Sequence, residues 1–287
     1  MPDPAPEAPK PAAFPWLTRE LQQRVVSAAI AAALALAVLV WGTVPFAILL
    51  AAIGAAMSWE WCRIVRGNAV DAGTAVHIAT TLAAAGLTAF SMAGLALAAV
   101  AIGAITVAAL TTGSGRSILS SVGVLYTGLP VIALAWLRSD GTLGLLAVLF
   151  VLLAVVATDT AAYFTGRTVG GPKLWPAISP NKTWSGLAGG VAAAALTGAL
   201  FPHMTGSGWS SWLSGLGFFL ALIAQAGDLG ESALKRHFGL KDASELIPGH
   251  GGFMDRMDGV VTASVAAALI ALASEAYAPA RALLYGS

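Results

Sequence analysis

The stretch TLGLLAVLFVLLAVVATDTAAY, residues 142–163, is predominantly apolar and contains one charged residue, Asp159, near its end. A helix needs about 20 mostly apolar residues to cross the hydrocarbon core of a bilayer. This stretch meets that length, and it carries too little polar surface for a helix in water. It therefore predicts a transmembrane helix.

Much of the chain repeats this pattern. Hydrophobic residues make up 57% of the 287 residues, and the mean hydropathy is +0.80. Charged residues make up only 10%, against about 25% in an ordinary soluble domain. The predicted fold class is an all-α polytopic integral membrane protein with about nine transmembrane helices. The apolar runs are 25–41, 44–62, 74–90, 92–110, 121–137, 142–163, 184–202, 211–229 and 259–279.

The first residues differ in composition from the rest. They read MPDPAPEAPKPAAFP, which is rich in proline and alanine and lacks the basic segment and apolar core of a signal peptide. We expect 1–22 to be a disordered cytoplasmic tail and 23–287 to be a single membrane domain, since no internal repeat is visible. The single cysteine, Cys62, excludes an intrachain disulfide.

The placement of lysine and arginine predicts the orientation of the helices, because cytoplasmic loops carry an excess of both. With the N-terminus in the cytoplasm, 13 of the 15 basic residues fall inside, and only Arg138 and Arg281 lie outside. We expect a protein of the cytoplasmic (inner) membrane. Its chemistry should lie in two cytoplasmic-face segments, 155–186 and 228–258, because they are longer and richer than the rest and the outer connections are short and bland.

Aspartates lie at the cytoplasmic ends of the predicted helices. These aspartates are Asp159, Asp228, Asp255 and Asp258. Ionisable groups at membrane depth are costly and often mark functional sites. Carboxylates without histidine or cysteine partners suit Mg²⁺, and the four scattered histidines show no zinc-like spacing. The alternative for Asp159 is a structural ion pair with Arg167 or Lys182.

Basic residues are interleaved with these acids. Ser232, Lys235 and Arg236 have i, i+3, i+4 spacing, which places them on one face of a helix that continues beyond the membrane run. Lys241 and Arg256 add two cations. Carboxylates that hold a metal ion, together with cations that hold phosphates, are typical of phosphate chemistry. An ordinary P-loop motif and a G-x-S-x-G motif are both absent.

Two loops have features that could bind phosphate. PGHGGF, residues 248–253, offers three glycines without Cβ atoms and N–H groups directly before a helix. ISPNKTWSG, residues 178–186, has two interpretations. It is either a phosphate-binding loop with Lys182 as the point charge or an N-terminal cap of the next helix, with Asn181 or Thr183 as the capping residue.

The segment SALKRHFGLKDASELIPGHGGFMDRMD, residues 232–258, resembles the signature of the phosphatidate cytidylyltransferases, also called CDP-diacylglycerol synthases. DTAAYFTGR and ISPNKTWSG resemble two further segments of that family. The resemblance is strong over residues 155–260 and weaker over the helices before them. One departure is Ser185, where the family usually carries glutamate, so a carboxylate role at this position does not carry over.

The resemblance implies a reaction that joins CTP to phosphatidate and gives CDP-diacylglycerol and pyrophosphate. It implies Mg²⁺, with a second metal ion or a monovalent cation as an open question, and Asp228 and Asp255 as metal ligands. The partners would be CTP and phosphatidate in the bilayer, with no nucleic acid; a homodimer is an open alternative to a monomer. The catalytic set is Asp228, Asp255, Lys235, Arg236, Arg256, Asp258 and His250. The substrate-binding set is Ser179, Asn181, Lys182, Thr183, Ser232, Lys241, Gly251, Gly252 and Asp159.

Two other functions fit parts of the pattern. A cation-coupled transporter could use Asp159 and Asp228 as ion sites, but both acids lie near helix ends, and the inverted repeat of many transporters is not visible. Another CTP-dependent lipid enzyme, such as a polyprenol kinase or an ether-lipid cytidylyltransferase, differs mainly in its lipid. The long signature favours phosphatidate.

Overall fold

The computed structural model describes residues 19–67, 70–205, 209–247 and 251–286, without the side chains of 19–28, 114, 204 and 205. Within these residues the regular structure is helical apart from one short hairpin, which confirms the predicted fold class. The helices are α1 (Arg19–Trp41), α2 (Thr43–Arg66), α3 (Ala72–Ala89), α4 (Ala93–Leu110), α5 (Ser117–Arg138), α6 (Gly144–Thr168), α7 (Trp184–Leu200), α8 (Ser211–His237), α9 (Met254–Ser274) and α10 (Pro279–Tyr285), with 3₁₀ turns η1 (Thr112–Ser114) and η2 (Phe201–Thr205). The hairpin strands are β1 (Lys173–Trp175) and β2 (Ser179–Thr183).

The predicted membrane runs correspond to nine of these helices. Eight, α2 to α9, are long and apolar enough to cross a membrane, and in α1 the apolar stretch with described side chains is the shorter Ala29–Trp41. Several boundaries differ from the prediction, two of them at the predicted tail and at the start of α9. Helix α1 begins at Arg19, inside the predicted tail 1–22, whose residues 1–18 lie outside the described residues. Helix α9 begins at Met254, so Asp255 and Asp258 lie within the helix and not before it.

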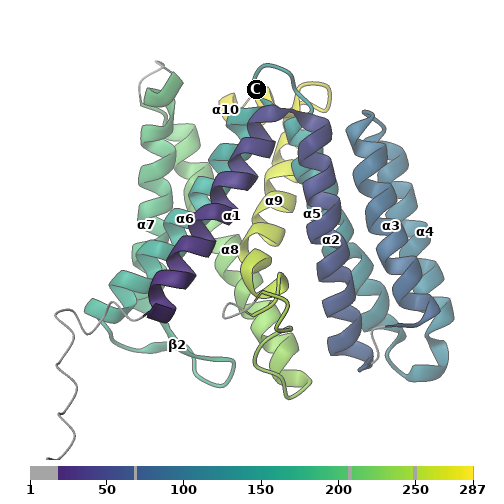
Figure 1. Ribbon diagram of the computed structural model, residues 1–287. Coiled ribbons are helices and arrows are strands. Elements are labelled where there is room, and N and C mark those ends of the chain that lie inside the picture. The colour runs from purple at the N-terminus through teal and green to yellow at the C-terminus, as the bar shows by residue number, and fades with distance from the viewer. Residues whose placement is uncertain (1–18, 68–69, 206–208, 248–250, 287) are drawn as a thin grey trace, which may run out of the picture.

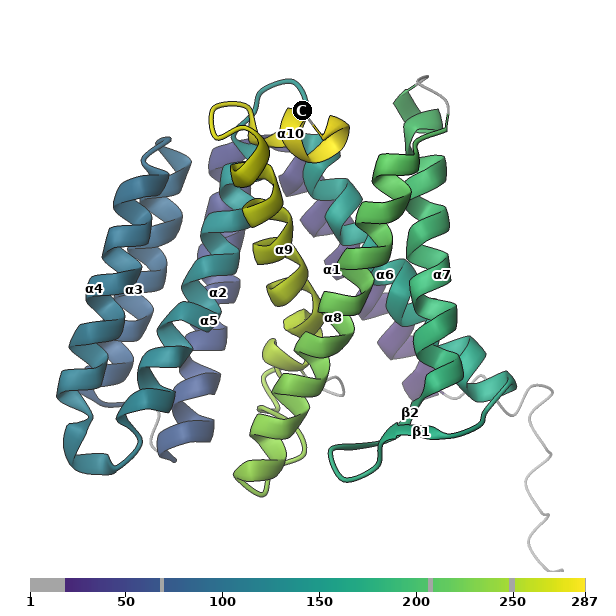
Figure 2. The same ribbon diagram turned by 180° about the vertical axis from the view of Figure 1, so that it is seen from behind.

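The helices form a bundle with two ends of different character (Figures 1 and 2). Helices α2 to α5 pack on one side, α6 to α8 on the other, and α9 packs between them against α5 and α8. One end, called the hairpin end below, carries the β1–β2 hairpin, the α2–α3 and α4–α5 connections and the segment between α8 and α9. The opposite end carries α10. The charge pattern assigned these same connections to one side of the membrane.

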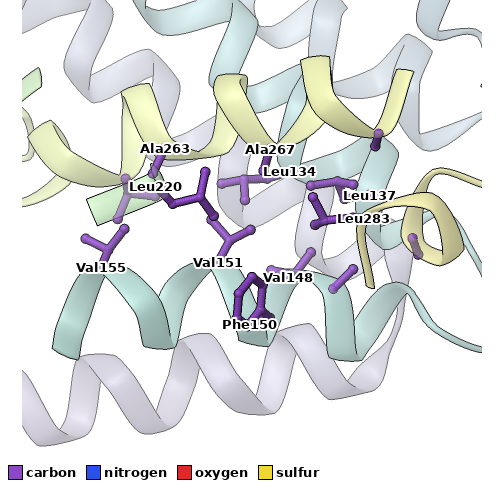
Figure 3. Close-up of a cluster of buried hydrophobic side chains, with 14 of the residues drawn as sticks. Leu134, Leu137, Val148, Phe150, Val151, Val155, Leu220, Ala263, Ala267 and Leu283 are labelled. Carbon is purple, nitrogen blue, oxygen red and sulfur yellow. The ribbon is translucent and has the colours of Figure 1, made fainter. Parts of the chain in front are cut away.

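An apolar core joins the two sides of the bundle (Figure 3). Side chains of α6, including Val151 and Val155, face Leu220 of α8 and the alanines of α9. Phe150 is fully buried and packs edge-to-face on Phe201, with ring centroids 5.3 Å apart. The alanines of α9, Ala263 among them, allow the helix to sit close to its neighbours, because small side chains let backbones approach in membrane bundles.

A buried polar cluster holds α2, α3 and α5 together. His77 Nε2 lies 2.9 Å from the hydroxyl of Thr127, and His77 Nδ1 lies 3.3 Å from Cys62 Sγ. The hydroxyl of Ser58 donates to Thr127 and lies 3.1 Å from the hydroxyl of Thr81. Buried polar groups in a bilayer need partners within the protein, and here each one finds its partner on a neighbouring helix.

Two glycines of α8 provide a test of helix packing. A Cβ on Gly217 would lie 2.3 Å from the carbonyl oxygen of Ala194 in α7, whereas a Cβ on Gly215 would have no heavy atom within 4 Å. We expect Gly217→Ala to lower the stability of the purified protein by about 1–3 kcal/mol, because it overpacks the α7–α8 contact. Gly215→Ala should be neutral or stabilise by up to about 1 kcal/mol through helix propensity. Thermal unfolding in detergent measures both, and equal transition temperatures would contradict the close contact.

Candidate active site

A cavity of about 640 Å³ opens at the hairpin end between α6, α7, α8 and the hairpin. Of the two segments in which the sequence predicts the chemistry, 155–186 supplies most of the lining, whereas Asp228 is the residue of 228–258 that lines the cavity. Asp159 comes from α6, Lys182 from β2 and Asp228 from α8. The polar residues that line it are Asp159, Tyr163, Arg167, Lys173, Asn181, Lys182, Thr183, Gln225 and Asp228.

A chain of polar contacts crosses this cavity. Lys182 Nζ lies 2.5 Å from Asp228 Oδ2 and donates to Gln225 Oε1 at 3.2 Å. The amide nitrogen of Gln225 donates to Asp159 Oδ1 at 3.1 Å. The side chains of Lys182 and Asp228 are 19% and 24% exposed, so both remain accessible from the cavity. Lys182 therefore pairs with Asp228, and its link to Asp159 runs through Gln225 and not through the direct ion pair considered above.

The hairpin positions Lys182. Its strands are antiparallel, and Lys173 pairs with Thr183 and Trp175 with Ser179. The Thr183 side chain then caps α7 by accepting a hydrogen bond from the N–H of Gly186 at 3.1 Å. Of the interpretations left open for 178–186, the cap at Thr183 is present, and the adjacent Lys182 lines the cavity.

Ser185, the departure from the family pattern, has a structural contact. Its hydroxyl donates to the carbonyl of Gly170 and lies 3.0 Å from the Thr183 hydroxyl. These contacts tie the end of the α6–hairpin connection to the first turn of α7. Asp159 is the carboxylate that lines the cavity on the α6 side.

A second cluster of charges lies between α8 and the start of α9. Lys235 Nζ lies 2.5 Å from Asp255 Oδ1 and 3.1 Å from Glu231 Oε1. Asp255 Oδ2 also accepts the N–H groups of Ala243 at 2.9 Å and of Gly252 at 2.8 Å. The two aspartates predicted to share a metal ion are therefore paired with different lysines, Asp228 with Lys182 and Asp255 with Lys235.

Asp258 stands between the two clusters. Its Oδ1 accepts the N–H of Gly259 at 2.6 Å, and it lies close enough to Asp228, Asp159 and Lys182 to interact with them electrostatically. On the α8 side, the Ser232 hydroxyl donates to Asp228 Oδ1 at 3.4 Å. Among the described residues no set of three or more histidine, cysteine, aspartate or glutamate side chains is arranged around one point.

The glycine loop differs from the prediction. The N–H of Gly252 donates to Asp255, and the N–H groups of Phe253 and Met254 donate to Glu60 on α2 at 2.9 and 2.8 Å. The helix N-terminus that was expected to bind a phosphate is thus occupied by carboxylates of the protein. Gly251 has a φ of 84°, a conformation that favours glycine, and its carbonyl accepts the N–H of Ile247. His250 lies outside the described residues.

The remaining predicted residues lie at the periphery. Arg236 is exposed, and its guanidinium donates to the carbonyls of Ile178 at 3.4 Å and Leu240 at 3.1 Å, which links α8 to the hairpin loop. Lys241 and Arg256 are also exposed, and neither lines the cavity. Ser179 does not line the cavity either, although Asn181, Lys182 and Thr183 of the same strand do.

Sequence reasoning missed three residues of these clusters. Gln225, Glu231 and Glu60 are polar side chains inside apolar helices, and all three are buried. The same rule that selected Asp159, an ionisable group at membrane depth, would have selected Glu60 within the run 44–62. No comparable rule predicts that Glu60 contacts residues almost two hundred positions later in the chain.

Comparisons with known proteins agree with these segments. The sequence profile described as "Cytidylyltransferase family" matches residues 22–273. The chain is similar to the phosphatidate cytidylyltransferase of Brucella suis biovar 1 (strain 1330), with 46% identity over 146 residues, 50% of this chain and 53% of the relative. It is similar to that of Staphylococcus aureus (strain COL), with 41% identity over 138 residues, 48% of this chain and 52% of the relative.

These relatives are matched over about half of their length. The family profile, by contrast, runs from within α1 to the last turn of α9 and so covers most of the bundle described above. The chain belongs to the cytidylyltransferase family.

Proposed function

We propose that this chain transfers CMP from CTP to phosphatidate and forms CDP-diacylglycerol and pyrophosphate. The observation that carries this proposal is the cavity at the hairpin end, where Asp159, Lys182 and Asp228 meet at the ends of membrane helices. A site at that depth can receive a polyanionic nucleotide from water and a phosphate headgroup from the bilayer. Membership of the cytidylyltransferase family and the names of the relatives support the same reaction.

The chemistry requires little proton transfer. A phosphate oxygen of phosphatidate attacks the α-phosphorus of CTP and forms a new P–O bond. The bond from that phosphorus to the oxygen bridging to the β-phosphorus breaks, and pyrophosphate leaves with the electron pair. Because the attacking phosphate is already ionised at neutral pH, catalysis rests on alignment of the two substrates and on neutralisation of their charge.

The residues of the cavity suit these two tasks. Lys182 and Lys173 supply ammonium groups from the hairpin, and Arg167 supplies a guanidinium from α6. Arg and Lys are the side chains that most often hold phosphates in proteins. Asn181 adds an amide at the same wall. We assign these groups to the phosphates of CTP and phosphatidate, and we place the reacting phosphorus near Asp228.

We propose that a magnesium ion binds in this region on the chemistry of its carboxylates, although among the described residues no three of them are arranged around one point. Asp228, Asp258 and Asp159 offer carboxylate oxygens only, which Mg²⁺ prefers, and Asp228 is accessible from the cavity. We propose Asp228 and Asp255 as its protein ligands, as the family resemblance implies. A bound Mg²⁺ would neutralise phosphate charge and help to orient the α-phosphate. Binding at Asp255 requires that its oxygens share or give up the contacts with Lys235 or with the loop N–H groups.

The proposed location follows from the charge pattern. We infer that the hairpin end faces the cytoplasm from the inner membrane, because the basic connections lie there and CTP is a cytoplasmic nucleotide. Protease protection of tags placed on the hairpin and after α10 in oriented vesicles would test the orientation. Cross-linking in native membranes would distinguish a homodimer from a monomer.

The test of function is an assay with detergent-purified protein, CTP labelled at the α-phosphate, Mg²⁺ and phosphatidate. We expect labelled CDP-diacylglycerol and unlabelled pyrophosphate. A polyprenol kinase would instead transfer label to polyprenol from CTP labelled at the γ-phosphate. An ether-lipid cytidylyltransferase would be recognised by a parallel reaction with an ether-linked phosphatidate analogue. Absence of labelled lipid from folded protein, together with cation uptake in proteoliposomes, would instead favour a transporter.

Lys182 allows a sharper prediction. Lys182→Met should lower kcat/KM by about 100-fold, because a cation beside the reacting phosphates and next to Asp228 is removed. Lys173→Met is the matched control, since Lys173 lies on the same cavity wall but is exposed, and it should lose less than about tenfold. Equal losses in the two variants would show that only the net charge of the hairpin matters.

A further inference from the structure

Glu60 is a fully buried carboxylate in the membrane helix α2, and its contacts lie far away in the sequence. Its Oε1 accepts the Ser244 hydroxyl at 2.5 Å and the N–H of Phe253 at 2.9 Å, and its Oε2 accepts the N–H of Met254 at 2.8 Å. A buried carboxylate is costly unless it is hydrogen-bonded, and all of these donors come from the segment that leads into α9. Glu60 therefore ties that segment to the opposite side of the bundle.

The start of α9 depends on these hydrogen bonds. The first N–H groups of a helix have no partner within the helix, and the residue at the N-cap position, Phe253, provides no side-chain acceptor. Glu60 fills this role from a different helix and places negative charge at the positive end of α9. Gly252 is part of the arrangement, because a Cβ there would lie 2.4 Å from Glu60 Oε1.

Asp255 holds the same segment from the other side. It accepts the N–H of Gly252, which directly precedes the two N–H groups bound by Glu60, and it contacts Lys235 of α8. We propose that Glu60 is a positioning residue: by fixing the first turn of α9 against α2, it sets the place of the Asp255 carboxylate beside α8. Glu60 touches no substrate in this proposal, and its effect on turnover passes through Asp255.

The kinetic part of this inference rests on the proposed function, whereas the structural part does not. If Glu60 positions the segment, its loss should loosen residues 243–258 locally and should lower kcat more than it changes KM. If Glu60 only contributes to the stability of the whole bundle, its loss should affect α3 and α4 as much as this segment. Hydrogen exchange resolves these cases by region.

The main variant is Glu60→Gln, which keeps the size of the side chain but turns one acceptor into an NH₂ group facing N–H or O–H donors. Backbone amide exchange of residues 243–258 should become roughly tenfold faster or more, while exchange in α3 and α4 stays unchanged. With CTP, phosphatidate and Mg²⁺, kcat should fall about 100-fold, because a misplaced group near the chemistry has effects of that size. Both KM values should stay within about threefold of wild type.

Asp71→Asn is the matched control. Asp71 is also a carboxylate cap at the hairpin end, since it accepts the N–H of Thr74 at the start of α3 at 2.6 Å, and it pairs with Arg66. This variant should alter exchange at the start of α3 and leave kcat unchanged. The same kinetic loss in Asp71→Asn and Glu60→Gln would overturn the proposal.

Other outcomes are also decisive. Wild-type exchange or wild-type kcat in Glu60→Gln would overturn the positioning role. If Glu60→Gln does not fold, the variant to test is Ser244→Ala, which removes one hydrogen bond to Glu60. It should still accelerate exchange in 243–258 and lower kcat. A Ser244→Ala variant without a local change in exchange would overturn the proposal. If the wild-type protein itself makes no CDP-diacylglycerol, the proposed function fails, and the exchange comparison still decides whether Glu60 holds this segment.

Discussion

Asp228→Asn is expected to lower kcat by about 10³-fold, the upper end of the effect of removing one group that stabilises the charge of a transition state. Asp228 lines the cavity and pairs with Lys182 at 2.5 Å, and in the proposed function it meets both a metal ion and the reacting phosphates. Asparagine keeps the shape and one acceptor oxygen but removes the charge. Assays at saturating CTP, phosphatidate and Mg²⁺ measure the loss.

The same variant should fold normally. Asp228 and Lys182 form a pair that is partly exposed to the cavity, so its loss should change the free energy of unfolding by no more than about 1 kcal/mol. Glu275→Gln is the matched control, because it makes the same carboxylate-to-amide change at an exposed position at the far end of α9. A kcat for Asp228→Asn near that of Glu275→Gln would remove Asp228 from the catalytic set.

The sequence predicts the bundle because its information is local. Each apolar run decides by its own length and composition whether it crosses a membrane, and the position of basic residues decides its direction. Once α6 and α8 run in the same direction, Asp159 and Asp228 must lie at the same end, and the structure brings them together through Gln225. The position of these two aspartates at one end of the bundle could therefore be predicted without knowledge of tertiary contacts.

The contacts of the second cluster could not be predicted in this way, because they depend on how the segment after α8 folds back before α9 and on its packing against the distant Glu60. Asp255 was expected to be available for a metal ion, but its orientation depends on where Lys235 and the N–H groups of Ala243 and Gly252 lie after packing. The loop glycines were expected to approach phosphate, yet Gly252 is adjacent to Glu60. Short elements were also missed: the β1–β2 hairpin and α10 have no long periodic pattern to reveal them.

Asp255→Asn is therefore expected to differ from Asp228→Asn, although both should lose activity. The sequence alone suggests that replacing either aspartate leaves the fold intact. In the structure, Asp255 accepts three hydrogen bonds, from Lys235 and from the N–H groups of Ala243 and Gly252. Asparagine must turn its NH₂ group toward one of these donors. We expect a loss of about 3 kcal/mol in the free energy of unfolding, within the range for breaking a buried charged contact by removing one partner.

The pair of variants separates chemistry from positioning. Both should lower kcat by about 10³-fold, but only Asp255→Asn should lower the unfolding temperature in detergent and accelerate amide exchange in residues 243–255. Lys235 retains Glu231 as an ion partner at 3.1 Å, so the bundle should remain folded and the loosening should stay local. If the two variants have identical unfolding temperatures and identical exchange, the contacts of Asp255 do not stabilise the loop. Near-normal turnover in Asp255→Asn would remove Asp255 from the proposed metal site.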